Sequence, residues 1–157
     1  MSAGLSPELK KKIAEIIGRY PKKGAAILPV LHCIQKEKGA IAKEEEQWVA
    51  DLLEIKPIRV REVVTFYTMF HQRPVGRYHI QVCSNLTCSM MGGEKVVDHL
   101  QKRLGIKIGE TTPDQRFTLS EVECLGACEQ APCMMINFEY YGRLDPEKID
   151  SLLGGLD

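Results

Sequence analysis

Four of the six cysteines in this 157-residue chain form two spaced pairs. Four residues separate Cys83 from Cys88, and three residues separate Cys124 from Cys128. Cysteine thiolates are soft ligands that select zinc, copper(I) or iron–sulfur clusters. A 2Fe-2S cluster requires four such ligands, two on each iron. The spacing therefore indicates a metal centre, and such a centre requires a fold that brings two distant loops together.

The spacing favours an iron–sulfur cluster but leaves one alternative open. Structural zinc sites usually have about two to four residues between paired ligands. The four residues between Cys83 and Cys88 lie at the edge of this range, so a zinc site fits less well but stays open as an alternative. A Rieske centre would use two histidines in place of two cysteines. That interpretation is weak, because every histidine lies outside the two loops: His32, His71, His79 and His99. We interpret Cys133 as a buried structural thiol in a strand, and Cys33 as a core residue of a helix.

Charge and hydropathy limit the function classes. The 21 basic residues balance the 21 acidic ones, so no net charge attracts the chain to nucleic acid. No run of about 18 apolar residues is present, so no direct membrane insertion is expected. The N-terminus has neither an apolar signal segment nor an Arg-rich presequence. We therefore expect a cytoplasmic chain, in which cysteines are more often metal ligands or buried thiols than disulfides.

The first half of the chain has helical periodicity. A helix is expected after the N-cap Ser6, ending before Tyr20-Pro21. Further helices are expected over about 25–38, 43–54 and 58–70. The last of these contains many β-branched residues that also suit a strand. We expect a helix there because the segment is longer than a typical strand. Together these segments predict a small antiparallel helical bundle over residues 1–73.

The apolar period changes to two after residue 73. Strands are expected over about 78–83, 116–123 and 132–140, and helices over about 93–104 and 146–153. This order predicts an α/β layer arrangement in residues 74–157. Ligands of such sheets bind beyond the carboxyl ends of parallel strands. Because Cys83 and Cys124 both lie at the exits of predicted strands, we expect the two cysteine loops to meet.

The chain resembles a known family in the spacing of Cys83 and Cys88 and in these segments: Tyr78–Cys83, Glu123–Cys128, Ala131–Pro132, Tyr20–Pro21, Leu28–His32 and Glu62–Phe70. That family is the thioredoxin-like 2Fe-2S ferredoxin subunit, the E subunit, of the NADH dehydrogenase module of respiratory complex I. The resemblance covers nearly the whole chain. It implies an α/β fold in which an N-terminal antiparallel helical bundle is followed by a thioredoxin-like 2Fe-2S ferredoxin domain.

The resemblance also implies a cofactor and a partner. One 2Fe-2S cluster would be held by Cys83, Cys88, Cys124 and Cys128. A flavoprotein subunit would carry FMN, the NADH site and a 4Fe-4S cluster, within a larger complex I assembly that holds this chain peripheral to the inner membrane. The implied role is one-electron exchange as a subunit of NADH:quinone oxidoreductase.

The chain itself lacks the motifs of a complete active site. It has no GxGxxG after a strand, no P-loop and no nucleophile–base pair, so no catalytic residue is expected on it. Two alternatives to the complex I role stay open. One is the equivalent subunit of an NAD-linked hydrogenase or formate dehydrogenase, and the other is a zinc-held interaction module.

Overall fold

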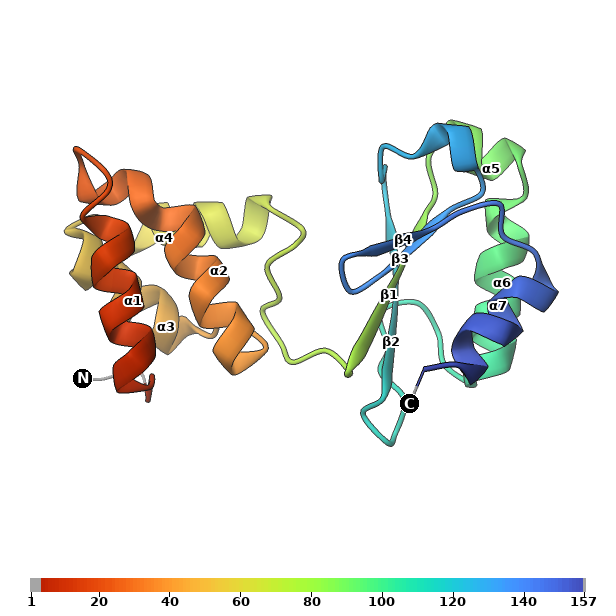
Figure 1. Cartoon of the computed structure of the whole chain (residues 1–157), viewed down its shortest axis with the longest axis horizontal. Helices are drawn as coiled ribbons and strands as arrows, with labels where there is room; N and C mark the ends of the chain where they lie inside the picture. Colours follow the sequence, from red (N-terminus) through yellow and green to blue (C-terminus); the bar gives the residue numbers. More distant parts are fainter. Residues whose placement is uncertain (1–3, 157) are drawn as a thin grey trace. The chain divides into compact units, whose positions relative to one another are not determined.

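The computed structural model describes residues 4–156. The chain divides into two compact units, Met1–Pro74 and Val75–Asp157 (Figure 1). Each unit buries its own hydrophobic core. None of the helices described between residues 4 and 156 is long and apolar enough to cross a membrane.

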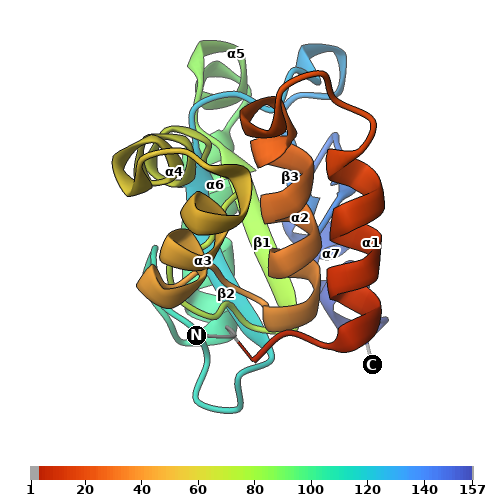
Figure 2. The ribbon, with the colours of Figure 1, turned by 90° about the vertical axis from the view of Figure 1, so that its left-hand side faces the viewer.

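The first unit is a bundle of α-helices. Its elements are α1 (Pro7–Ile17), a short 3₁₀ turn η1 (Lys23–Ala26), α2 (Ile27–Lys38), α3 (Lys43–Leu53) and α4 (Pro57–Phe66). Ser6 caps α1 as expected, since its hydroxyl accepts a hydrogen bond from the Leu9 N–H at 3.2 Å. Gly39 ends α2 in the left-handed conformation, with φ of 80°, which a glycine adopts without strain. Helices α1 and α2 lie side by side in Figure 2.

Helix α4 is shorter than the sequence pattern predicts, and the expected end near Phe70 is wrong. The helix stops at Phe66, and Tyr67 adopts an extended conformation. The Phe70 N–H then donates to the Tyr67 carbonyl oxygen at 3.0 Å and forms a turn. Phe70 is buried in the core while Phe66 is 77% exposed. Three aromatic residues within five positions exceed one helical face, so the chain leaves the helix to bury the last of them.

The second unit is a four-stranded sheet with helices. Its elements are β1 (Tyr78–Cys83), α5 (Leu86–Met90), α6 (Gly93–Leu104), β2 (Phe117–Val122), the 3₁₀ turn η2 (Cys128–Gln130), β3 (Met134–Ile136), β4 (Glu139–Tyr141) and α7 (Pro146–Gly154). The strand order is β2-β1-β3-β4. β1 and β2 are parallel, and the other two pairings are antiparallel.

One expected strand is two strands in the structure. The single strand expected over 132–140 is wrong, because β3 and β4 form a hairpin there. Asn137 has a positive φ of 56° at the turn. Asparagine tolerates this left-handed conformation better than most residues. Strands of three residues are too short to show an alternating pattern of their own.

Helices α6 and α7 cover one face of the sheet (Figure 1). Ile80 and Val82 of β1 are fully buried in the core on that side. Since side chains alternate along a strand, His79, Gln81 and Cys83 belong to the opposite set. The parallel pairing places Cys83 opposite Val122. The chain therefore leaves β1 and β2 at the same edge of the sheet.

Candidate metal centre

Three buried cysteines gather at this edge of the sheet. Cys83 ends β1, Cys88 lies in α5, and Cys133 directly precedes β3. Their Sγ atoms all lie within 4.8 Å of one another. The Sγ atoms of Cys88 and Cys133 are 3.7 Å apart. Sulfurs this close, in side chains that are buried, form a ligand set suited to a thiophilic metal.

The second cysteine pair lies on the loop that follows β2. Cys124 and Cys128 are both exposed, and Cys128 begins η2. Leu125 and Ala127 of the same loop pack against the three buried cysteines. Figure 1 shows this loop and α5 at the same end of the sheet. The two loops therefore meet, although neither exposed sulfur belongs to the 4.8 Å group.

The position of the Cys124 and Cys128 sulfurs outside the 4.8 Å group is compatible with a 2Fe-2S cluster. A single ion draws all its ligand atoms around one point, whereas a 2Fe-2S cluster divides its four cysteines between two irons. Its two ligand pairs consequently lie farther apart than the sulfurs of one mononuclear site. The structure brings Cys83 and Cys88 together and places the second pair on the facing loop.

Backbone N–H groups point at the sulfurs. The Gly126 N–H donates to Cys124 Sγ at 3.3 Å. Burial acts to raise the pKa of Cys83, but hydrogen bonds from the Asn85 and Leu125 N–H groups oppose it, and the pKa is lowered overall. Such donors stabilise negative charge on a thiolate or on a cluster sulfur. The donor set thus fits a buried anionic metal–thiolate centre.

The other two buried thiols differ from Cys83. Burial raises the pKa of Cys88, and burial raises the pKa of Cys133 to about 12. Cys133 is held in place by strand pairing, because the Cys83 N–H donates to its carbonyl oxygen at 3.1 Å. No sequence pattern indicates that Cys133 contacts the first cysteine loop. That contact depends on the antiparallel pairing of β1 with β3, for which the sequence carries no local signal.

A glycine allows the first cysteine loop to pack closely. Gly92 has a φ of 94° between α5 and α6. A Cβ atom on the next residue, Gly93, would lie 2.9 Å from the Cys88 carbonyl oxygen and 3.3 Å from that of Cys83. Helix α6 can therefore begin directly against the backbone of both cysteines only because Gly93 has no side chain.

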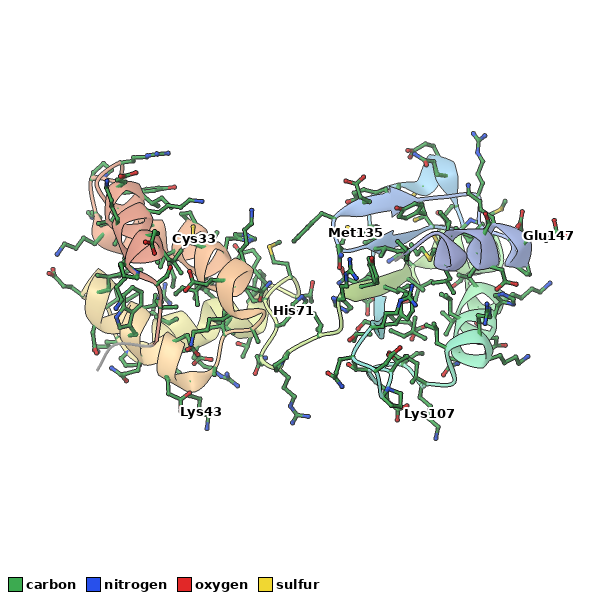
Figure 3. The ribbon with its side chains drawn as sticks, turned by 60° about the horizontal axis from the view of Figure 1, so that its bottom comes forward. Cys33, Lys43, His71, Lys107, Met135 and Glu147 are labelled. Carbon is green, nitrogen blue, oxygen red and sulfur yellow. The ribbon has the colours of Figure 1, made fainter. Side chains whose placement is uncertain are left out.

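The remaining sequence candidates do not belong to the group of three sulfurs. Cys33 is on α2 of the helical unit (Figure 3), where it packs partly buried against that core. The His79 ring nitrogen Nε2 lies 2.8 Å from the Ser120 hydroxyl, and His99 pairs with Asp150 at 3.1 Å. Among the described residues, the group of three or more potential ligand atoms consists of cysteines alone.

Comparison with known proteins identifies the family. The model of the thioredoxin-like [2Fe-2S] ferredoxin family matches residues 13–157. The chain is 46% identical over 145 residues to an E subunit of NADH-quinone oxidoreductase, numbered 2, from Rhizobium meliloti (strain 1021), covering 92% of this chain and 86% of that protein. It is 46% identical over 142 residues to the NADH-quinone oxidoreductase E subunit of Rickettsia felis, covering 88% and 85%.

A solved structure shares the fold. An NAD+-reducing [NiFe]-hydrogenase in the air-oxidized state matches with a TM-score of 0.70 and 26% identity. The match covers 82% of this chain but only 22% of the hydrogenase chain. The family model spans most of the sequence and includes both cysteine loops, and the curated relatives match over most of their own length. The chain therefore belongs to the thioredoxin-like 2Fe-2S ferredoxin family.

Proposed function

We propose that this chain is an electron-transfer subunit of an NADH:quinone oxidoreductase of the complex I type. It exchanges single electrons between one 2Fe-2S cluster and the FMN of a partner flavoprotein. The observation that carries this proposal is the meeting of two cysteine loops at the carboxyl edge of parallel strands, in a chain of this family. The two relatives named as E subunits of NADH-quinone oxidoreductases support the same role.

The proposed ligands are Cys83, Cys88, Cys124 and Cys128. When bound, the cluster supplies reversible one-electron oxidation and reduction. The protein contributes a buried first pair and an exposed second pair on a loop that packs against it. N–H groups directed at the sulfurs favour the negative charge that such a centre carries.

The two-electron chemistry belongs to the partner. In this proposal a flavoprotein subunit carries FMN, the NADH site and a 4Fe-4S cluster, and the larger assembly holds the chain at the cytoplasmic side of the inner membrane. The helical unit and the sheet unit act as separate domains, 1–73 and 74–157. Coexpression tests the partner: NADH should reduce the cluster in the two-subunit complex and not in this chain alone.

A second candidate is the equivalent subunit of an NAD-linked hydrogenase or formate dehydrogenase. The TM-score of 0.70 with the NAD+-reducing hydrogenase favours it. It ranks second because the identity there is 26%, against 46% with the E subunits of NADH-quinone oxidoreductases. Isolation of the native complex separates the two, since one contains quinone reductase activity and the other a hydrogenase or formate dehydrogenase subunit.

Electron paramagnetic resonance tests the cofactor. The anaerobically purified chain should be silent when oxidised, give a spin-one-half signal with dithionite, and contain about two irons and two sulfides. Replacing Cys88 or Cys128 with serine should abolish or severely alter this signal. Cys133→Ser and Cys33→Ser are the matched controls and should retain it. Loss of the signal in Cys133→Ser would overturn the ligand assignment.

A further inference from the structure

The third buried cysteine at the site has no place in the proposed set of four cluster ligands. Cys133 is 1% exposed, and its sulfur lies in the same group as those of Cys83 and Cys88. We propose that the chain, before it receives its cluster, binds one zinc ion through Cys83, Cys88 and Cys133. The inference rests on the proposed function only in treating Cys83 and Cys88 as residues that later bind the cluster.

The sulfur distances suit one ion. With Zn–S bonds of about 2.3 Å, two thiolates bound tetrahedrally to the same zinc lie about 3.8 Å apart. The observed separation between the Cys88 and Cys133 sulfurs is 3.7 Å, and all three sulfurs lie within 4.8 Å of one another. A zinc ion therefore requires only small side-chain shifts. Cys124 and Cys128 are exposed and lie outside this group, so they are not expected to bind the same zinc ion.

The three cysteines are also fixed in place before any metal arrives. The Cys83 N–H donates to the Cys133 carbonyl oxygen at 3.1 Å, which links β1 to the residue preceding β3. Gly93 lets α6 start against the backbone of Cys83 and Cys88. Ala127 belongs to the same buried cluster as the three cysteines. A preformed site loses little conformational entropy on binding, which favours affinity.

The binding reaction balances without an oxidant. The three thiols release their protons, and three Zn–S bonds form while zinc stays divalent. Three protein ligands leave the fourth position of a tetrahedral zinc for water, as in open zinc sites. An ion held in this way can exchange, so cluster assembly displaces it when Cys124 and Cys128 replace Cys133. In this scheme, Cys133 holds zinc in the cluster-free chain and is not a cluster ligand.

A zinc titration of the full-length, reduced, cluster-free chain against a chromophoric chelator tests the proposal. Wild type should bind one zinc per chain. Cys133→Ala should weaken binding at least about tenfold, since even loss of an outer-sphere partner often costs 10–100-fold. Cys128→Ser and Cys33→Ser, the latter in the core of the helical unit, should bind like wild type. Equal affinity of Cys133→Ala and wild type would overturn the proposal, and so would an equal loss in Cys128→Ser.

A second measurement needs no variant. Iodoacetamide should modify Cys124 and Cys128 at the same rate in zinc-loaded and zinc-free wild type, as followed by peptide mass spectrometry. Protection of both by zinc would show that the ion occupies the cluster ligands instead, and would overturn the proposal. Cluster content is measured separately. A chain that forms its cluster but binds no zinc through Cys133 refutes this inference alone, whereas a chain that binds zinc in this way but forms no cluster refutes only the proposed function.

Discussion

Gly93→Ala is expected to destabilise the sheet unit and to disturb the cluster. The added Cβ would lie 2.9 Å from the Cys88 carbonyl oxygen and 3.1 Å from its carbonyl carbon. Both atoms belong to backbone, so no flexible side chain can move aside. Overpacking of this kind typically costs about 1–3 kcal/mol. The gain from replacing a helical glycine with alanine is smaller, about 0.5–1 kcal/mol. The clash exceeds the propensity gain over most of these two ranges, and we expect a net loss of up to about 2.5 kcal/mol.

The matched control is Gly154→Ala at the end of α7. A Cβ at Gly154 would have no heavy atom within 4 Å, so only the helix propensity changes. This variant should be unchanged or up to about 1 kcal/mol more stable. Urea denaturation of the cluster-free chain measures both effects, and the dithionite-reduced electron paramagnetic resonance spectrum reports the cluster. A Gly93→Ala chain with wild-type stability and an unaltered spectrum would refute the close-packing argument.

Three further variants test other contacts. Gly142→Ala should lower the urea midpoint, because its Cβ would lie 2.3 Å from the Gln130 Cβ and 2.6 Å from the Gln130 carbonyl oxygen; an unchanged midpoint would contradict this packing. Glu46→Gln should cost about 1 kcal/mol, since the nearly buried Glu46 carboxylate pairs with a partly exposed Arg61 at 2.7 Å; a double-mutant cycle with Arg61→Gln that shows no coupling would refute the pair's contribution. Burial lowers the pKa of His71, so the unfolded chain binds the proton more readily. Stability should consequently be full above about pH 6.5 and fall as the pH drops below that value, and His71→Asn should flatten this dependence in urea titrations at two pH values.

Local signals in the sequence predict much of the fold. Ser6 and Gly39 mark helix ends through the chemistry of caps, and the alternation around Ile80 predicts β1 correctly. The 3.6-residue period predicts α6 and nearly all of α7. In each case the information is carried by neighbouring residues, which is the range over which pattern arguments hold.

The missed features depend on contacts between distant residues. Helix α5 has five residues, too few to show an amphipathic period. Phe70 lies beyond the end of α4 and is buried in the core of the bundle. Only the packing of the whole bundle determines that position. Cys133 reaches Cys88 across 45 positions of sequence through the pairing of β1 with β3. The positions of the cysteine pairs thus predict that the loops meet, but they cannot identify a third sulfur supplied by the residue before β3.

The core and the metal centre depend on the same strand register. Ile80 and Val82 must face α6 and α7, and this fixes which face of the sheet Cys83 occupies. Because side chains alternate along a strand, a slip of one residue would exchange these faces and turn Cys83 toward the helices. The same register pairs Cys83 with Val122, so Cys124 follows two residues beyond the shared edge. Burial of two apolar side chains in β1 therefore positions the first cysteine of one pair and, through β2, the first cysteine of the other.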